Sequence, residues 1–139
     1  MMLKTSEISE WLENITNPSH ELITEINNAI YKDSLVTFQQ SDIEKALKET
    51  TECHYAIAQK YGEEKEISAI ENLCKNLNLK GAKYFIVIIS QNGSLTLDKM
   101  NKMSDIIDKY IDSNTKIIIG DYAENRMWND IKLTGMVLK

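Results

Sequence analysis

The feature that most constrains the fold is the apolar run Tyr84-Phe85-Ile86-Val87-Ile88-Ile89. Successive side chains of a strand point to opposite faces of a sheet, so a strand that is apolar at every position must be covered on both faces. As a helix, the run would be far too short to cross a membrane, because a crossing takes roughly 20 residues. The run therefore predicts a buried strand over residues 82–90 in the middle of a covered sheet.

A second buried strand is expected over residues 116–120, which contain three isoleucines in a row. Between the two strands lies a predicted helix over residues 97–111, with Thr96 as its N-cap. The apolar face of this helix consists of Met100, Met103, Ile107 and Tyr110. Two buried strands that flank one helix predict a right-handed parallel crossover.

Two more strands complete the sheet. Residues 51–59 predict a strand, and residues 130–138 alternate as a final strand. The link over residues 121–129 is short, so we expect the final strand to form an antiparallel hairpin with the strand before it. A helix over residues 64–77 presents one apolar face, made of Ile67, Ile70, Cys74 and Leu77. The predicted fold is α/β (α+β), a mixed four-stranded sheet with helices packed on it.

The first 34 residues predict helices. Apolar residues repeat there at helical spacing, namely Ile8, Trp11, Leu12 and Ile15. Asn17 as N-cap and Pro18 at the first helical position predict the start of a second helix. Its apolar stripe consists of Leu22, Ile23, Ile26 and Ile30, and residues 33–34 end it. We expect one domain over residues 1–139, with a helical segment at 1–34 and the α/β part at 35–139.

Between these parts lies a short extended piece over residues 35–38. Ser41 and Glu44 then have the spacing of a capping box, in which each side chain bonds a backbone N–H at the start of the helix. We expect a short helix from there to about residue 48.

Composition excludes several function classes. The net charge is −5, and 15 lysines and one arginine are scattered without a basic stripe, so we expect no nucleic-acid partner. The N-terminus turns acidic at Glu7 with no apolar signal region, and we expect a cytoplasmic protein without a membrane segment. Cys53 and Cys74 are expected to be reduced thiols in the core.

Neither a metal nor a phosphate site is expected. Cys53 and His54 are neighbours on a strand and point to opposite faces, while His20 is far away in sequence. A phosphate-binding loop needs backbone amides brought close by glycine, but the chain has only five glycines and no glycine-rich loop. We therefore expect no cofactor, no metal and no enzymatic activity of the chain alone.

The order of motifs in the second half resembles a known family. Gly81-Ala82-Lys83 precedes the apolar strand, a turn with Gly93 leads to Leu95-Thr96-Leu97, and an Ile-rich strand ends at Ile119-Gly120. Ile131-Lys132-Leu133-Thr134 follows about ten residues later. This order is similar to the C-terminal domain of the FtsZ/tubulin superfamily, the bacterial cell-division tubulins, with matching spacing over residues 81–137. Residues 61–66 lie where the family has a G-E-N-R-A-like helix start.

The resemblance implies a candidate acid. The family's D-F-A-D-V loop supplies acidic residues that act on the nucleotide held by the next subunit of a filament. Asp42-Ile43 can match the final D-V, or Phe38 can match the Phe, but an insertion prevents both at once. Asp42 is thus the catalytic candidate, and its alternative interpretation is a first-turn acid favoured by the helix dipole. The family's GTPase domain and its glycine-rich loop are absent from the sequence.

Five residues are candidates for a protein interface. The N-terminal helix could dock on a second copy or on its own sheet, and the link before the last strand carries residue types enriched at interfaces. A satisfied surface aromatic is the alternative for that link. The candidates are Trp11, Leu12, Phe38, Arg126 and Trp128.

The function that the resemblance implies is an interaction or assembly module, in cell division or filament regulation, without GTPase activity alone. The domain leans on a long helix and a nucleotide domain in the family, so we expect self-association to cover the surface left free. Other possible partners are an FtsZ-like filament or another cell-division protein. The alternatives are a fragment of an FtsZ-like GTPase whose nucleotide domain is missing from this chain, and a small-ligand-binding domain. Met1-Met2 and the helical lead-in favour a complete small protein.

Overall fold

The computed structural model describes residues 10–32, 39–92, 95–124 and 129–139. A four-stranded mixed sheet forms its centre, in the order β1-β4-β2-β3. Strand β2 pairs in parallel with β3 and antiparallel with β4, and β4 pairs antiparallel with β1. The strands are β1 (Cys53–Tyr61), β2 (Tyr84–Gln91), β3 (Lys116–Ala123) and β4 (Asp130–Leu138). The predicted mixed sheet, with the apolar run at its centre, is confirmed.

The predicted hairpin between the last two strands is wrong. Strand β4 runs antiparallel to its neighbours, as expected, but it lies between β1 and β2 rather than beside β3. The physical reason is burial. Most positions of β4 are buried, so it belongs inside the sheet, whereas Ile117, Ile118 and Ile119 are only half-buried and suit an edge strand.

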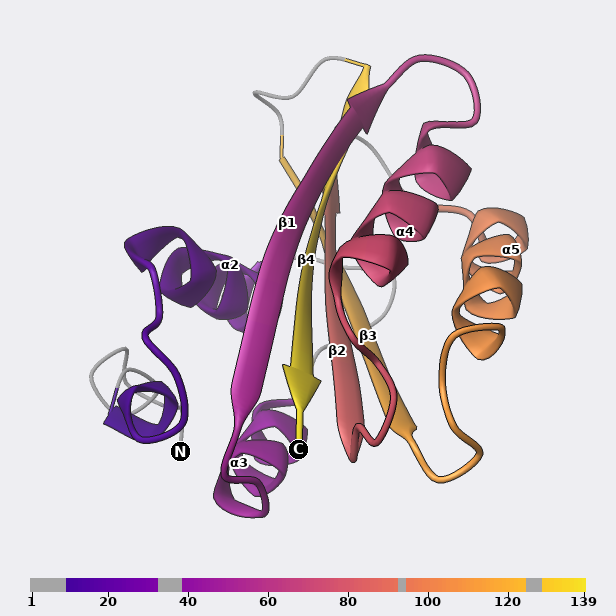
Figure 1. Cartoon of the computed structure of the whole chain (residues 1–139). Helices are drawn as coiled ribbons and strands as arrows, with labels where there is room; N and C mark the ends of the chain where they lie inside the picture. The colour runs from indigo at the N-terminus through magenta and orange to yellow at the C-terminus, as the bar shows by residue number, and fades with distance from the viewer. Residues whose placement is uncertain (1–9, 33–38, 93–94, 125–128) are drawn as a thin grey trace.

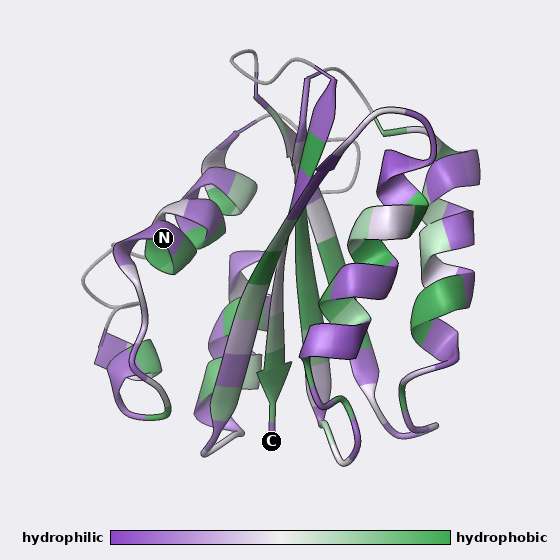
Figure 2. Cartoon of the chain, turned by 45° about the horizontal axis from the view of Figure 1, so that its top comes forward, coloured by the Kyte–Doolittle hydropathy of each residue, from purple (hydrophilic) through white to green (hydrophobic). Residues whose placement is uncertain are grey.

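Helices cover both faces of the sheet (Figure 1). Helices α4 (Lys65–Asn76) and α5 (Leu97–Asp108) lie on one face, and α2 (His20–Tyr31) and α3 (Gln40–Lys48) lie on the other with the helical residues 10–13. Hydropathy follows the same division, because the green, apolar sides of the helices turn toward the sheet (Figure 2). The N-terminal helices therefore complete a layer of the chain's own core.

Two predicted helix starts are wrong. Helix α2 begins at His20 and not at Pro18, since the Ser19 hydroxyl accepts a hydrogen bond from the Leu22 N–H at 3.1 Å and acts as the cap. Helix α3 begins at Gln40 without a side-chain cap, so the capping box is not formed. Glu44 instead pairs with Lys48 one turn later, at 2.8 Å.

The Thr96 cap is confirmed, because its hydroxyl accepts a hydrogen bond from the Lys99 N–H at 3.2 Å. The extended piece predicted over residues 35–38 lies outside the described residues. Both cysteines are free and buried, as expected. Among the helices that the structure describes, none has the length and apolar character needed to cross a membrane.

One glycine is required by close packing between layers. A Cβ atom placed on Gly135 of β4 would lie 2.7 Å from Cδ2 of Leu73 in α4. Such a separation is far inside van der Waals contact, so the absence of a side chain lets α4 rest on the middle of the sheet.

Candidate functional site

A polar row crosses the whole sheet near one end. Each strand contributes one residue, and the register places Gln59 beside Lys132, Lys132 beside Ser90, and Ser90 beside Tyr122. Paired residues of neighbouring strands point to the same face, so the whole row faces α2. The same face is largely apolar toward the other end of the sheet, where α3 packs. Polar residues at this one level are therefore a distinct feature of the α2 side.

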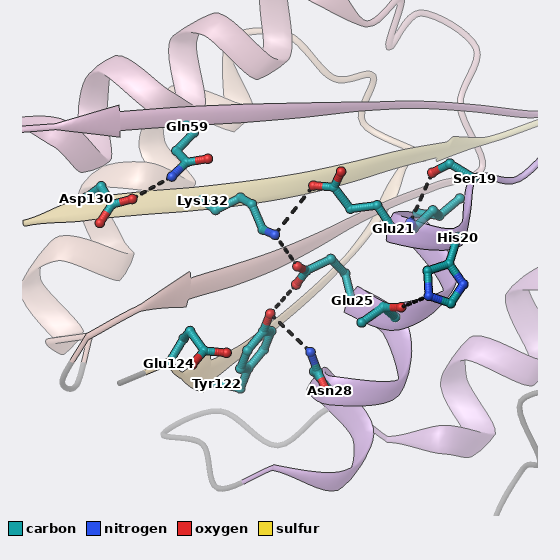
Figure 3. A network of polar contacts seen from close by, with 12 residues as sticks. Ser19, His20, Glu21, Glu25, Asn28, Gln59, Tyr122, Glu124, Asp130 and Lys132 are labelled. Carbon is teal, nitrogen blue, oxygen red and sulfur yellow. Dashed lines mark hydrogen bonds and ion pairs between the residues drawn. The ribbon is translucent and has the colours of Figure 1, made fainter. Parts of the chain in front are cut away.

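An ion pair joins this row to α2 (Figure 3). One carboxylate oxygen of Glu25 pairs with the Lys132 ammonium, and the other accepts a hydrogen bond from the Tyr122 hydroxyl. The Asn28 amide donates to that hydroxyl at 3.4 Å, and Glu21 lies 3.5 Å from the Lys132 Nζ. Glu25 is only 3% exposed, so the carboxylate has exchanged water for these partners.

The pKa values of Lys132 and Tyr122 are both raised. Burial by itself lowers the pKa of Lys132, but the hydrogen bond and the charge of Glu25 outweigh it. Burial is the main cause for Tyr122, and its hydrogen bond to Glu25 adds to it. A charged lysine and a neutral tyrosine are therefore the stable forms at neutral pH.

A pocket of about 410 Å³ lies beside this network. Carboxylates of Glu21, Glu25 and Glu124 outnumber the Lys132 cation within it. Over the described residues, no group of three or more His, Cys, Asp or Glu side chains is arranged to hold a metal ion. The clearest chemical role of the arrangement is to fix the position of α2 on the sheet.

Sequence reasoning missed this network because its partners are far apart along the chain. Glu25 and Lys132 are 107 positions apart, and neither belongs to a short motif. One signal was present. Ser90 directly follows the apolar run, and Lys132 interrupts the buried strand that the register places opposite it.

Asp42, the candidate acid, lies in the first turn of α3 and is exposed. This position is the one that the helix-dipole interpretation predicted. Around it, Lys45, Tyr84 and Lys116 line a shallow surface hollow. Its catalytic role stays a prediction.

The interface candidates fall into two groups. Trp11 is half-buried with its ring 5.0 Å from the Lys48 Nζ, and Leu12 is fully buried in the core on the α2 side. Both residues thus pack within one chain, and their role at an interface stays a prediction. The other three candidates lie outside the described residues, namely Phe38, Arg126 and Trp128.

Comparison with known proteins decides the family. Residues 55–138 match the sequence model of the FtsZ family, C-terminal domain. The chain belongs to the FtsZ family. It is 24% identical over 123 residues to the cell division protein FtsZ of Wolbachia pipientis, and equally so to that of another Wolbachia. These alignments cover 85% of this chain but only 39% and 31% of the two relatives, so the chain spans well under half of their length.

Solved structures share the fold. An empty FtsZ dimer of M. jannaschii superposes with a TM-score of 0.72 at 15% identity, covering 95% of this chain and 43% of the other. A TubZ protofilament of Bacillus thuringiensis serovar israelensis gives 0.60 at 11% identity, with 86% and 34% covered. A CetZ2 protofilament of Haloferax volcanii gives 0.56 at 10%, with 76% and 34% covered. Because the first superposition covers 95% of the chain, the N-terminal helices also have counterparts in the FtsZ fold.

The match places the site within the FtsZ-family domain. All four residues of the polar row lie on strands inside the matched range, and Glu25 precedes it. The matched range begins at residue 55, so the correspondence of Asp42 to the family's acidic loop remains a prediction.

Proposed function

We propose that this chain is an interaction and assembly module of the FtsZ family, which binds a second copy, an FtsZ-like filament or another cell-division protein. The observation that carries the proposal is the match of residues 55–138 to the family's C-terminal domain. Proteins of the same fold are described as a dimer or as protofilaments, which supports a role in contacts between subunits. A cytoplasmic location belongs to the same proposal.

As part of the same proposal, this chain alone has no GTPase activity. The sequence has five glycines and no glycine-rich loop that could bring backbone amides around a phosphate.

One further observation favours the second candidate function, a fragment of an FtsZ-like GTPase. The chain covers only 39% of the Wolbachia pipientis relative, so a nucleotide-binding part could act with it from elsewhere.

Two measurements test the proposal. In calorimetry with GTP and Mg²⁺ we expect no binding, and micromolar binding by this chain would contradict the absence of a nucleotide site. In pelleting assays with filaments assembled from an FtsZ relative, we expect the chain to sediment with the filaments. The Lys132→Met variant removes the ion pair that joins the sheet to Glu25 of α2, so its pelleting tests whether this contact is needed for binding.

A further inference from the structure

Strand β1 is one of the two edge strands of the sheet. It has nine residues and pairs along its whole length with β4, in an unbroken register without a bulge. In Figure 1 it lies at the front of the molecule, with α2 to one side and α4 to the other. A long, regular edge strand is a surface onto which another strand can add.

The hydrogen-bond pattern shows which backbone groups face outward. Glu52 and Lys139 exchange two backbone hydrogen bonds, at 3.1 and 2.9 Å, so the next residue of β1 must turn its N–H and C=O away from β4. The next residue is Cys53, and its N–H indeed donates to the Ile15 carbonyl at 3.1 Å. By the same alternation, the backbone N–H and C=O groups of four further residues point away from β4. These residues are Tyr55, Ile57, Gln59 and Tyr61. No strand among the described residues pairs with them on that side.

The side chains of these four residues lie on the α2 side of the sheet. Tyr55 is half-buried against the core on that side, and its hydroxyl donates to the Asn17 carbonyl at 3.1 Å, whereas Gln59 is exposed. Helix α2 approaches β2 and β3 most closely, and it reaches β4 through Glu21 and Glu25, which pair with Lys132. Tyr61 is 82% exposed, the highest value among the large hydrophobic side chains that the structure describes, and Ile57 is half-buried. Within the described part of the chain, the edge of β1 therefore combines backbone groups that pair with no other strand and the exposed side chain of Tyr61.

We propose that β1 pairs with β1 of a second copy, antiparallel and across a two-fold axis at Ala58, so that two sheets become one. This register uses only the four residues whose backbone groups point away from β4. It places Tyr55 opposite Tyr61 of the partner subunit, and Ile57 opposite Gln59 of the partner subunit. Each such pair exchanges two hydrogen bonds and the symmetry doubles both pairs, which gives about eight bonds.

Chemistry favours a second copy as the occupant. The chain carries a net charge of −5, yet residues 53–61 contain no acidic side chain, so two copies can approach at this strand with little repulsion. The register sets Lys60 opposite Ala56 of the partner subunit, and it brings two aromatic side chains together as a stabilising cross-strand pair. A register centred on Ile57 is less favourable, because it needs the Cys53 N–H, which Ile15 already binds.

This inference rests on the proposed function and names its partner and surface. It differs from the sequence-based expectation that the N-terminal helices form the contact. Hydrogen exchange followed by NMR at low and high micromolar concentration separates the two. We expect the amides of Tyr55, Ile57, Gln59 and Tyr61 to gain protection at high concentration. The alternate amides in β1, which bond to β4, should be protected at both concentrations.

Proline variants provide the sharper test. Ile57→Pro removes an outward N–H and no bond to β4, so we expect a folded chain whose dimer dissociation constant rises at least roughly tenfold. Ile119→Pro is the matched control. Its N–H faces away from β2 on the opposite edge, since Lys116 and Glu124 donate toward the β2 side, and it should leave the dimer intact. Tyr61→Asp, at a side chain that is 82% exposed, should weaken the dimer even if the proline variant does not fold.

Three outcomes would overturn the inference. They are a dimer that Ile57→Pro and Tyr61→Asp leave unchanged, a dimer that Trp11→Glu alone disrupts, and a strict monomer at high micromolar concentration. The second outcome would leave the assembly function standing on the N-terminal surface. Pelleting with filaments tests that function independently of all three.

Discussion

Removing the cation of the buried network should destabilise the protein strongly. Lys132→Met keeps most of the side-chain volume but leaves the Glu25 carboxylate, 3% exposed, with the Tyr122 hydroxyl and without its counter-charge. Breaking a buried ion pair from one side costs about 3–5 kcal/mol. Because the Lys132 side chain keeps 20% of its exposure, we expect the lower end, about 3 kcal/mol, or a fall in Tm of roughly 10 °C.

Urea unfolding at pH 7, followed by circular dichroism, measures this loss. Lys102→Met is the matched control, because Lys102 pairs with Asp98 at 3.4 Å with side chains 59% and 78% exposed, and it should cost less than about 1 kcal/mol. The double variant Glu25→Met/Lys132→Met should recover much of the loss, since no charge is then left buried. Equal losses for the two single lysine variants would refute the reasoning.

The same network predicts a pH dependence. The pKa of Lys132 is raised above its ordinary 10.5 in the folded state, so between the two values the folded chain binds the proton that the unfolded chain has lost. The stabilisation that the Lys132 ammonium contributes to the folded state is fully present below pH 10.5, and it is lost as the pH rises through the folded-state pKa. The stability difference between the wild type and Lys132→Met should therefore shrink above that pH. A difference that stays constant as the pH is raised well past 10.5 would contradict the assignment.

Three further predictions concern the core. Gly135→Ala should cost about 1–3 kcal/mol in urea unfolding, because the new methyl meets Leu73, and a neutral result would show that α4 is not closely packed there. Cys53 and Cys74 are buried, which raises the pKa of each thiol to about 12, so a disulfide reagent at pH 8 should label them only after unfolding. Fast labelling of the native protein would contradict their burial. Ile88→Asp should prevent cooperative thermal unfolding, since it places a charge on a central strand, and an unchanged Tm would exclude that position for β2.

Local patterns in the sequence determined most of the fold, and long-range pairing was where they failed. The run at residues 84–89 predicts a central strand because strand periodicity is local. Strand β4 could lie beside β3 at the edge of the sheet or between β1 and β2. The short link from β3 favours the first position, whereas the burial of β4 favours the second, which the structure shows. The helix starts were also ambiguous from sequence. Pro18 suits the first turn of a helix, but Ser19 can cap the same helix one residue later. Glu44 can bond a backbone N–H at the start of its helix, or it can pair with Lys48.

The site was less predictable than the fold. Asp42 and Trp11 were accessible to sequence reasoning because a family motif and a helical stripe marked them. The Glu25–Lys132 pair forms only when α2 lies on β4, so no local pattern contains it. The free edge of β1 depends on the strand order, which was the feature that sequence reasoning had wrong.

Sedimentation velocity of the wild-type chain, from low to high micromolar concentration, tests the assembly role most directly. The account predicts a shift from a 16.0 kDa monomer to a dimer with rising concentration, and a shift to much faster species when filaments of an FtsZ relative are added. A monomer of 16.0 kDa at every concentration, unchanged by the filaments, would contradict it.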